Sequence, residues 1–423
     1  MPTASFSYAQ LAERFQQLDE FLLQHQPLWR PRPFTHMRLG WESELPELAL
    51  WLRGRSLEDA EAAHNQPAQL LAPAPFPQLA ARAIALSCMD ELPSSPIRNT
   101  DARQLADVPG RKWLQIQAFD AALTFSEVPH HWVDWCAGKG HLGRQLVRRG
   151  GKGHLGRQLV RRGGELTCLE WDQALVTAGA HLSQKLGIGA NHRQQDVMAD
   201  DVAAQLNPTT TPIALHACGD LHVRMINLSI AQRCQQLAIA PCCYNRTQTD
   251  RYRPLSTLGR QSSLELSRDD LGLPLSETVT AGARERRQRD QSMAWRLGFD
   301  LLQRELRGKN DYLPTPSLPS SWLKKRFAQY CRDLAALKQL PEPSEQNWDA
   351  LERRGWQRLA EVRNLELLRG LFRRPLELWL LLDRALLLAE NGYAVRLGTF
   401  CPAELTPRNL MLIAELEARF AST

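Results

Sequence analysis

The sequence has no long run of apolar residues. A membrane-spanning helix needs about 20 consecutive apolar residues, whereas the richest stretch, Leu376–Leu388, contains Glu377, Asp383 and Arg384. The first residues also lack the basic segment and the apolar core of a secretion signal. We therefore expect a cytoplasmic protein with no membrane partner.

Regularly spaced cysteines are also lacking. The nine cysteines include no C-x-x-C pair, which argues against a disulfide framework and against a zinc knuckle. Four of them, Cys136, Cys218, Cys242 and Cys243, follow short apolar stretches. A small reduced thiol fits the packed end of a strand, so we expect free thiols there.

The excess of basic over acidic residues is small and has a local origin. Residues 138–150 and 151–163 are identical copies of GKGHLGRQLVRRG, and each copy carries one Lys, three Arg and no acidic residue. Removing one copy lowers the formal net charge from +6 to +2. The overall charge is therefore no indication of a nucleic-acid partner.

The chain of 423 residues is long enough for two or three domains. Residues 1–110 combine helical segments with proline-rich connections and tryptophans, which predicts a helical region. From 111 to 423, short apolar strands alternate with helices, a pattern typical of a parallel sheet covered on both faces. We predict an α/β, Rossmann-like domain with a helical insertion at about 285–390, closed by a β-hairpin. The expected strands are 132–137, 166–170, 192–196, 213–216 and 237–240, with a hairpin formed by 393–400 and 409–414.

A glycine-rich turn follows the first expected strand. Gly138-x-Gly140-x-x-Gly143 fits a nucleotide-binding loop, in which glycines permit a tight turn and the amides of the next helix face the ligand. Asp134 lies within the preceding strand, where a buried carboxylate is costly unless it has a function. An acid ahead of such glycines is typical of S-adenosylmethionine (SAM) enzymes, where it helps to hold the cationic methionine end. Cys136 replaces the first glycine of that pattern, which is tolerable if its φ angle is negative. The expected loop residues are Asp134, Cys136, Ala137, Gly138, Lys139 and Gly140.

Glu170 ends the second expected strand, where a carboxylate binds ribose hydroxyls about 20 residues after the first glycine. Gly138 and Glu170 are 32 positions apart, and removing one 13-residue copy reduces this to 19. Asp196 follows the third strand, at the expected position of the adenine amino group. Since copy 1 follows a strand directly, we expect it to form the loop; the alternative is that copy 2 forms the packed helix and copy 1 loops out.

Three motifs resemble the methyltransferase domain shared by the methyltransferase-like 25 group and the glutathione S-transferase C-terminal-domain-containing protein. They are Asp134–Gly143 (DWCAGKGHLG), Ala214–Asp220 (ALHACGD) and Pro241–Asn245 (PCCYN), and residues 398–402 and 406–409 fit the end of that domain. The resemblance covers roughly 111–423. It implies a class I SAM-dependent methyltransferase fold and SAM as cofactor, but no acceptor.

The second and third motifs follow apolar strands, so they should meet at the ligand-binding edge of the sheet. One interpretation is an acceptor pocket in which His216, Asp220, Tyr244 and Asn245 orient the substrate, with His216 also bordering the cofactor. A second is purely structural, and a third is a zinc site of His216, Cys218, Cys242 and Cys243. Because adjacent cysteines chelate one ion poorly, we expect no metal. Cys242 is also a candidate nucleophile if a neighbour lowers its pKa.

The leading hypothesis is methyl transfer from SAM to an unidentified acceptor. The alternatives are a non-catalytic scaffold with the same fold and an NAD-dependent oxidoreductase. Residues 284–309 hold seven Arg and one Lys against four acids. Such a stretch is usually a solvated helix surface, but beside the site it would suit RNA or an RNA-associated protein as acceptor.

Overall fold

The computed structural model describes residues 5–96, 108–149, 164–276 and 282–418. The chain folds as two compact units. The sheet unit contains Met1–Leu23, Ser87–Glu277 and Leu376–Thr423, and the helical unit contains Gln24–Leu86 and Thr278–Pro375. Their boundaries differ from those of the domains expected at 1–110 and 111–423, which stay a prediction.

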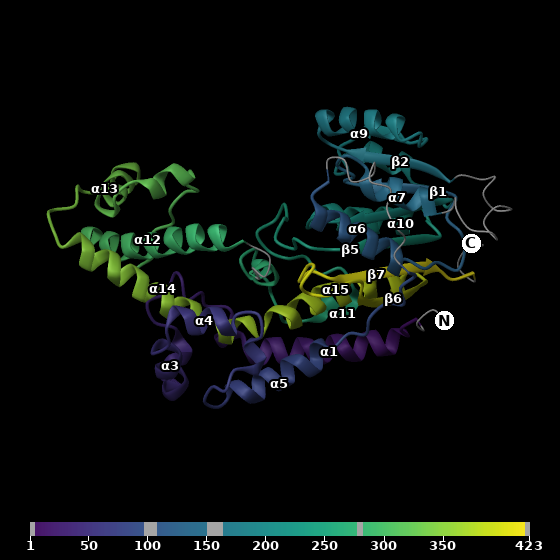
Figure 1. Cartoon of the computed structure of the whole chain (residues 1–423). Helices are drawn as coiled ribbons and strands as arrows, with labels where there is room; N and C mark the ends of the chain where they lie inside the picture. Colours follow the sequence, from purple (N-terminus) through teal and green to yellow (C-terminus); the bar gives the residue numbers. More distant parts are fainter. Residues whose placement is uncertain (1–4, 97–107, 150–163, 277–281, 419–423) are drawn as a thin grey trace. The chain divides into compact units, whose positions relative to one another are not determined.

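The sheet unit holds a seven-stranded sheet with the order β3-β2-β1-β4-β5-β7-β6 (Figure 1). The strands are β1 (His131–Trp135), β2 (Glu165–Glu170), β3 (Asn191–Gln194), β4 (Thr210–Leu215), β5 (Gln236–Ala240), β6 (Tyr393–Thr399) and β7 (Leu410–Leu416). Neighbours among β1 to β5 pair in parallel, whereas β7 runs antiparallel to both β5 and β6. The expected Rossmann-like sheet with a closing hairpin is confirmed.

Helices alternate with the parallel strands because the intervening segments carry apolar residues at helical spacing. In chain order they are α6 (Gly110–Ala122), which precedes β1, then α7 (His141–Arg149), α9 (Gln173–Lys185) and α10 (Asp220–Ala231). The α7 helix packs on β1 and β2, α9 on β2 and β3, and α10 on β4. The Asp172 carboxylate caps α9 by accepting a hydrogen bond from the Ala174 amide at 2.7 Å. The sheet unit also contains α11 (Thr257–Gln261) and most of α1 (Tyr8–Gln24) and α15 (Arg373–Glu390).

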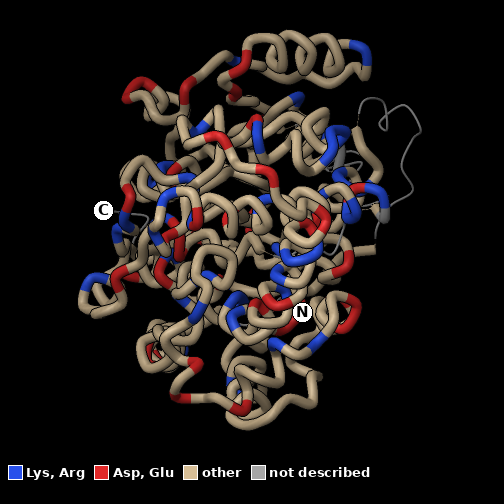
Figure 2. The backbone as a smooth tube through the Cα atoms, turned by 90° about the vertical axis from the view of Figure 1, so that its left-hand side faces the viewer, with Lys and Arg blue, Asp and Glu red and all other residues tan. Residues whose placement is uncertain are grey.

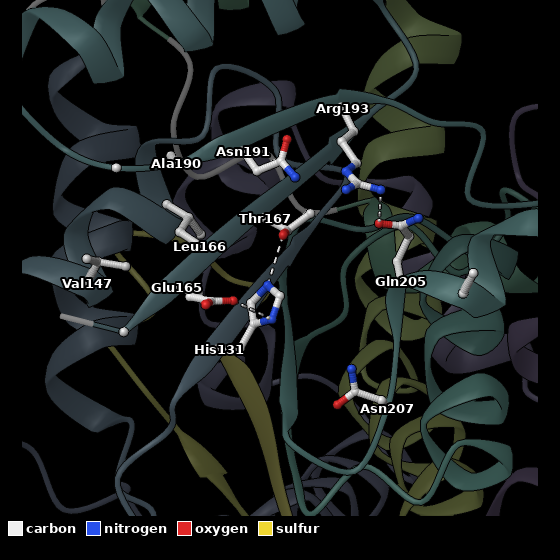
Figure 3. A pocket seen from close by; sticks show the side chains of 13 residues that line it. His131, Val147, Glu165, Leu166, Thr167, Ala190, Asn191, Arg193, Gln205 and Asn207 are labelled. Carbon is white, nitrogen blue, oxygen red and sulfur yellow. Dashed lines mark hydrogen bonds and ion pairs between the residues drawn. The ribbon is translucent and has the colours of Figure 1, made fainter. Parts of the chain in front are cut away.

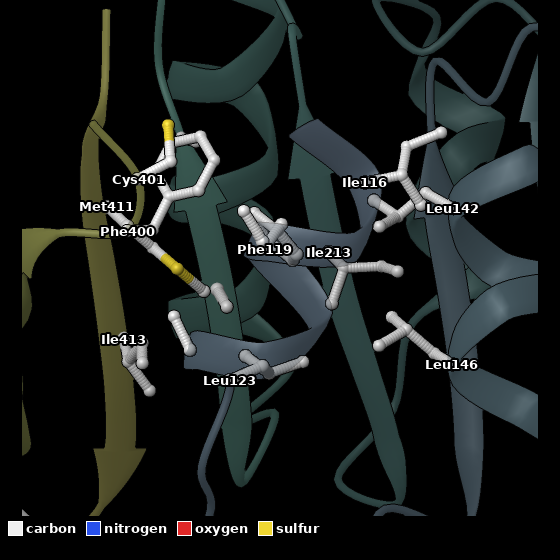
Figure 4. Packing of buried hydrophobic residues seen from close by; sticks show 14 of the residues in the cluster. Ile116, Phe119, Leu123, Leu142, Leu146, Ile213, Phe400, Cys401, Met411 and Ile413 are labelled. Atoms are coloured by element: carbon white, nitrogen blue, oxygen red, sulfur yellow. The ribbon is translucent and has the colours of Figure 1, made fainter. Parts of the chain in front are cut away.

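One apolar core fixes α6 and α7 against the sheet (Figure 4). Phe119 from α6 is fully buried, as is Ile213 from β4, and Leu146 from α7 joins the same cluster. The Phe119 ring meets that of Phe400, which follows β6, edge to face at 6.0 Å. This core sets the position of the loop between β1 and α7, because it holds both flanking elements.

The helical unit contains α2 (Gln26–Trp29), α3 (Pro46–Arg53), α4 (Leu57–Ala63), α12 (Ala283–Arg307), α13 (Phe327–Leu337), α14 (Trp348–Gly370) and nearly all of α5 (Phe76–Ser87). On α12, Trp295, Phe299 and Leu302 are buried against α13 and α14. Gly355 permits a close approach of α14 to α12, since a Cβ there would lie 2.5 Å from the Ala294 carbonyl oxygen. The α14 helix ends at Gly370, and α15 begins at Arg373.

Two of the strands that end earlier than expected are each followed by a non-glycine residue with a positive φ angle. The strand expected at 132–137 ends at Trp135, and the one expected at 213–216 ends at Leu215. The next residues, Cys136 and His216, have φ angles of +57° and +74°, which lie outside the extended region and stop the strands. None of the helices in the described ranges is long and apolar enough to cross a bilayer.

Candidate active site

Copy 1 of the repeat forms the turn between β1 and α7. Gly138 and Gly140 have φ angles of +57° and +73°, a region that glycine adopts without strain. A Cβ on Gly140 would lie 2.8 Å from His192 Cε1 and 2.9 Å from Cys168 Sγ. Copy 1 therefore follows the strand as predicted, whereas copy 2, residues 151–163, lies outside the described residues.

Cys136 departs from the expectation that its φ is negative. The value of +57° is one that residues with a Cβ rarely adopt. The turn that leaves β1 therefore imposes the glycine conformation of the motif on a cysteine. A negative φ would have made a cysteine tolerable at this position, but the φ of Cys136 is positive. The surrounding fold therefore maintains a strained backbone conformation.

The Asp134 side chain lies beneath the loop and is only 2% exposed. Its Oδ2 atom accepts a hydrogen bond from the Gly143 amide in the first turn of α7, at 2.9 Å. Burial raises the pKa of this carboxyl to about 6, although the Gly143 hydrogen bond and Arg144 oppose the rise. Asp134 thus ties the strand to the helix and adds negative potential under the loop.

Glu170 joins the end of β2 to the same loop. Its Oε2 atom accepts a hydrogen bond from the Gly138 amide at 2.8 Å, and its Oε1 atom accepts one from the Asp172 amide at 3.0 Å. The next residue, Trp171, is 68% exposed. An exposed indole beside a binding loop offers a flat apolar surface, and sequence analysis missed it although it follows Glu170 directly.

The remaining expected cofactor residues lie on neighbouring turns. The Asp196 Oδ1 atom accepts a hydrogen bond from the Met198 amide at 2.9 Å, just after β3. The Ala137 amide donates to the Leu169 carbonyl at 2.9 Å, and the Lys139 carbonyl accepts from Arg144 Nη1 at 2.6 Å. The loop is therefore anchored at both ends by backbone groups.

His216 follows β4 and is held by a helix from a distant part of the sequence. Its Nε2–H donates to Gln115 Oε1 of α6 at 2.7 Å. Burial, assisted by Lys112 and Arg408, lowers its pKa to about 4, so the imidazole is neutral at physiological pH. With Nε2 acting as donor, Nδ1 is left as an acceptor. Sequence analysis missed Gln115, which lies 101 residues away.

The second and third motifs meet, as their positions after β4 and β5 predicted. The Asp220 amide donates to the Arg246 carbonyl at 3.1 Å, and Asp220 Oδ2 accepts from the Gln248 amide at 2.7 Å. Gly219 allows this approach, because a Cβ there would lie 2.0 Å from the Arg246 carbonyl oxygen. Asp220 therefore links the two turns.

The aromatic and amide residues of the third motif differ in accessibility. The Tyr244 side chain is 1% exposed, and its ring packs edge to face against His222 at 6.1 Å and beneath the guanidinium of Arg384 at 5.0 Å. The Asn245 Oδ1 atom is buried and accepts no hydrogen bond from the residues that the structure describes. Asn245 therefore offers an acceptor atom, whereas Tyr244 braces the turn from below.

A buried chain of side chains also supports the turn after β4. Arg384 Nε donates to His222 Nε2 at 2.7 Å, and His222 Nδ1–H donates to the Ala217 carbonyl at 3.0 Å. Arg384 and Asp383 lie in the apolar stretch 376–388, and Asp383 accepts from the Ser256 amide at 2.9 Å. Asp383 and Arg384 are charged residues within a leucine-rich stretch, and this pattern could have indicated from the sequence that they have buried partners.

The thiols do not have the properties of a nucleophile at Cys242. Hydrogen bonds with Cys218 and Cys243, together with burial, raise the pKa of the Cys242 thiol. Hydrogen bonds from the same two neighbours, and the positive charges of Arg408 and Arg246, lower the pKa of Cys243. A nucleophilic thiolate needs a lowered pKa, and the raised pKa of Cys242 does not meet this condition. The role of Cys242 as a nucleophile stays a prediction.

A cavity of about 680 Å³ lies elsewhere on the sheet (Figure 3). It is lined by His131 and Glu165, the first residues of β1 and β2, and by Asn207 ahead of β4. These are the amino ends of the strands, whereas Glu170 and His216 follow the carboxyl ends. The cavity is therefore separate from the candidate site.

The candidate site lies where β1 adjoins both β2 and β4, at the carboxyl ends of the strands. Ligands of doubly wound sheets bind at this position.

Residues 112–250 match the sequence model of a family described as a methyltransferase domain. This part of the chain is similar to a methyltransferase domain. The matched range contains β1 to β5 and all three motifs. A search of curated proteins found no significant match.

Proposed function

We propose that the protein is a SAM-dependent methyltransferase. The observation that carries the proposal is the loop at the carboxyl end of β1, in which Gly138 and Gly140 adopt glycine conformations and Glu170 closes the loop from β2. This loop lies within the range similar to a methyltransferase domain. SAM supplies a methyl group already activated on a sulfonium, so the protein contributes mainly position and alignment.

The polar groups around the loop suit a cation that carries ribose hydroxyls. Glu170 is the candidate for the hydroxyls, because each of its oxygens still has a lone pair beyond its one hydrogen bond. Asp134 supplies negative potential for the methionine end, and Asp196 is the candidate for the adenine amino group. The backbone of Ala137, Gly138, Lys139 and Gly140, with Cys136 and His216 at the edges, would line the rest. Trp171 offers a surface for the adenine ring.

On the acceptor side, two groups can accept hydrogen bonds from a nucleophile. The neutral His216 presents Nδ1, and Asn245 presents a buried Oδ1 with no described partner. Both suit an amine or a hydroxyl acceptor. Asp220 and Tyr244 contribute by stabilising the turns after β4 and β5. Cys242 is buried in the turn after β5.

The sheet argues against the NAD-dependent alternative. A dinucleotide-binding sheet repeats a parallel half in the strand order 3-2-1-4-5-6, whereas here β7 runs antiparallel between β5 and β6. A negative carboxylate below the loop would also oppose a pyrophosphate. A non-catalytic scaffold remains the second candidate and would bind SAM without turnover.

Calorimetry with SAM, its demethylated product and NAD tests the proposal. We expect binding of the first two and none of NAD. Glu170→Ala should weaken SAM binding by about 1.5–3 kcal/mol, the contribution of a hydrogen bond to a charged group. Glu165→Ala is the matched control, since Glu165 begins the same strand and has a side chain that is 81% exposed. Equal affinities of the Glu170 and Glu165 variants would contradict the assignment.

We infer that RNA, or a protein associated with RNA, is one candidate acceptor. Arg284, Arg286 and Arg287 are exposed in the first turns of α12. Further along the same helix, Arg304 pairs with Asp300 at 2.9 Å. Basic and acidic residues are interspersed along the backbone (Figure 2). The exposed arginines at the start of α12 are the candidates for phosphate contacts.

A further inference from the structure

Three cysteine thiols converge next to the turns that follow β4 and β5. The Sγ atoms of Cys218, Cys242 and Cys243 all lie within 4.8 Å of one another, and those of Cys218 and Cys242 are 3.6 Å apart. None of the three is in a disulfide. Within the described ranges, this is the one group of three His, Cys, Asp or Glu ligand atoms gathered closely enough to hold a metal ion.

The spacing suits a thiophilic ion. Zinc binds thiolates at about 2.3 Å in a tetrahedron, which places neighbouring sulfurs about 3.8 Å apart. The Cys218–Cys242 pair already has this separation. The widest pair would have to close by at most about 1 Å from 4.8 Å, which a small rotation about χ1 provides. Because both adjacent cysteines turn their sulfurs toward Cys218, the geometry removes the objection that neighbouring cysteines chelate poorly.

Two positive charges also act on the cluster. Metal binding requires deprotonated cysteines, and the guanidinium groups of Arg246 and Arg408 act electrostatically on Cys243. The two guanidinium groups would also offset the surplus negative charge of three thiolates around a divalent ion. Cys218 and Cys243 are half-buried, so an ion can enter, whereas Cys242 is 4% exposed.

We propose that Cys218, Cys242 and Cys243 bind one thiophilic divalent ion of the zinc type. The ion joins the turn after β4 to the turn after β5, and its fourth position is left to water or to an acceptor group. Ordinary packing of small apolar thiols does not explain why the sulfurs of the consecutive residues Cys242 and Cys243 both lie close to that of Cys218. It also does not explain the positive charges near them. This site goes beyond the proposed methyl transfer, which does not depend on it.

The test uses the full chain, purified without chelator and incubated with Zn²⁺ before gel filtration. We expect about one zinc per chain by elemental analysis, the stoichiometry of a single site. Replacing the zinc by Co²⁺ should give the sulfur-to-metal charge-transfer absorption of thiolate ligands. Cys243→Ser should weaken that absorption and lower the affinity for zinc at least about tenfold.

Cys88→Ser is the matched control, because Cys88 is a free, exposed cysteine outside the group. It should keep both the zinc and the cobalt absorption. Thermal unfolding of each variant shows whether a loss of metal reflects unfolding. Cys218→Ser tests a second half-buried ligand of the proposed site and should also lower the affinity for zinc. Only trace zinc and no charge-transfer band in folded wild-type protein would overturn the proposal, as would a band that survives in both Cys218→Ser and Cys243→Ser.

Discussion

Asp134→Asn should make the stability of the protein less sensitive to pH. The Asp134 carboxyl is buried, and its pKa is raised from 3.8 to about 6. A carboxyl with a raised folded pKa binds its proton more tightly in the folded state than in the unfolded state. Its contribution to stability is therefore greatest below the unfolded pKa of about 3.9 and is lost as pH rises through about 6.

The size of the effect follows from the two pKa values. The ionised form of Asp134 costs about 3 kcal/mol of stability at pH 8 and about half of that at pH 5, by proton linkage. Asparagine retains an oxygen that accepts from the Gly143 amide but has no titrating proton. Any constant penalty for burying its NH₂ group is the same at both pH values. The stability of Asp134→Asn relative to wild type should thus rise by about 1.5 kcal/mol from pH 5 to pH 8.

Urea unfolding of both proteins at several pH values measures this difference. All other titrating groups are common to the two proteins and cancel in the comparison. The reasoning would be refuted by parallel curves of stability against pH.

In wild type, SAM affinity should increase as pH rises through about 6, because the cationic ligand favours the ionised carboxylate of Asp134. A SAM affinity that does not change with pH would show that Asp134 takes no part in cofactor binding.

Three further outcomes are expected. Deleting 151–163 should leave a folded protein that binds SAM at least as tightly, since copy 1 already forms the loop; unfolding or loss of binding would show that copy 2 is integrated. Cys136→Gly should raise the free energy of unfolding by about 0.5–1 kcal/mol, because glycine tolerates a φ of +57°; a decrease would contradict the strain. Replacing Arg284, Arg286 and Arg287 with Gln should weaken RNA binding and reduce its salt dependence, whereas salt-insensitive or absent RNA binding would favour another acceptor.

The sheet was predictable because its strands carry their own signal. The strands that end near Trp135, Glu170 and Ala240 are short apolar segments, each followed by a turn, and their burial matches that pattern. Parallel pairing then follows from the helices between them. The early ends at Cys136 and His216 were not predictable, because residue type alone does not indicate a positive φ in a non-glycine residue.

The site could be predicted only as far as local motifs extend. The meeting of the second and third motifs follows from their shared position after neighbouring strands. Gln115 and Arg384 were missed because they contact His216 and His222 from 101 and 162 residues away. Likewise, no local pattern indicates that 24–86 and 278–375 form one compact unit.

Three departures from local rules lie at the carboxyl edge of the sheet, although Arg233 and Gln339 also have a positive φ angle elsewhere. Cys136 and His216 carry backbone strain at the ends of β1 and β4. Asp134, two residues before Cys136, is a buried carboxylate. Each feature lowers stability, and strain of this kind persists only where the surrounding fold enforces it. The described residues that line the cavity at the amino ends of the strands include no positive φ angle outside glycine and no buried charge. Strain and a buried charge at the carboxyl edge agree with ligand binding there, and substitutions that stabilise this edge are expected to weaken ligand binding.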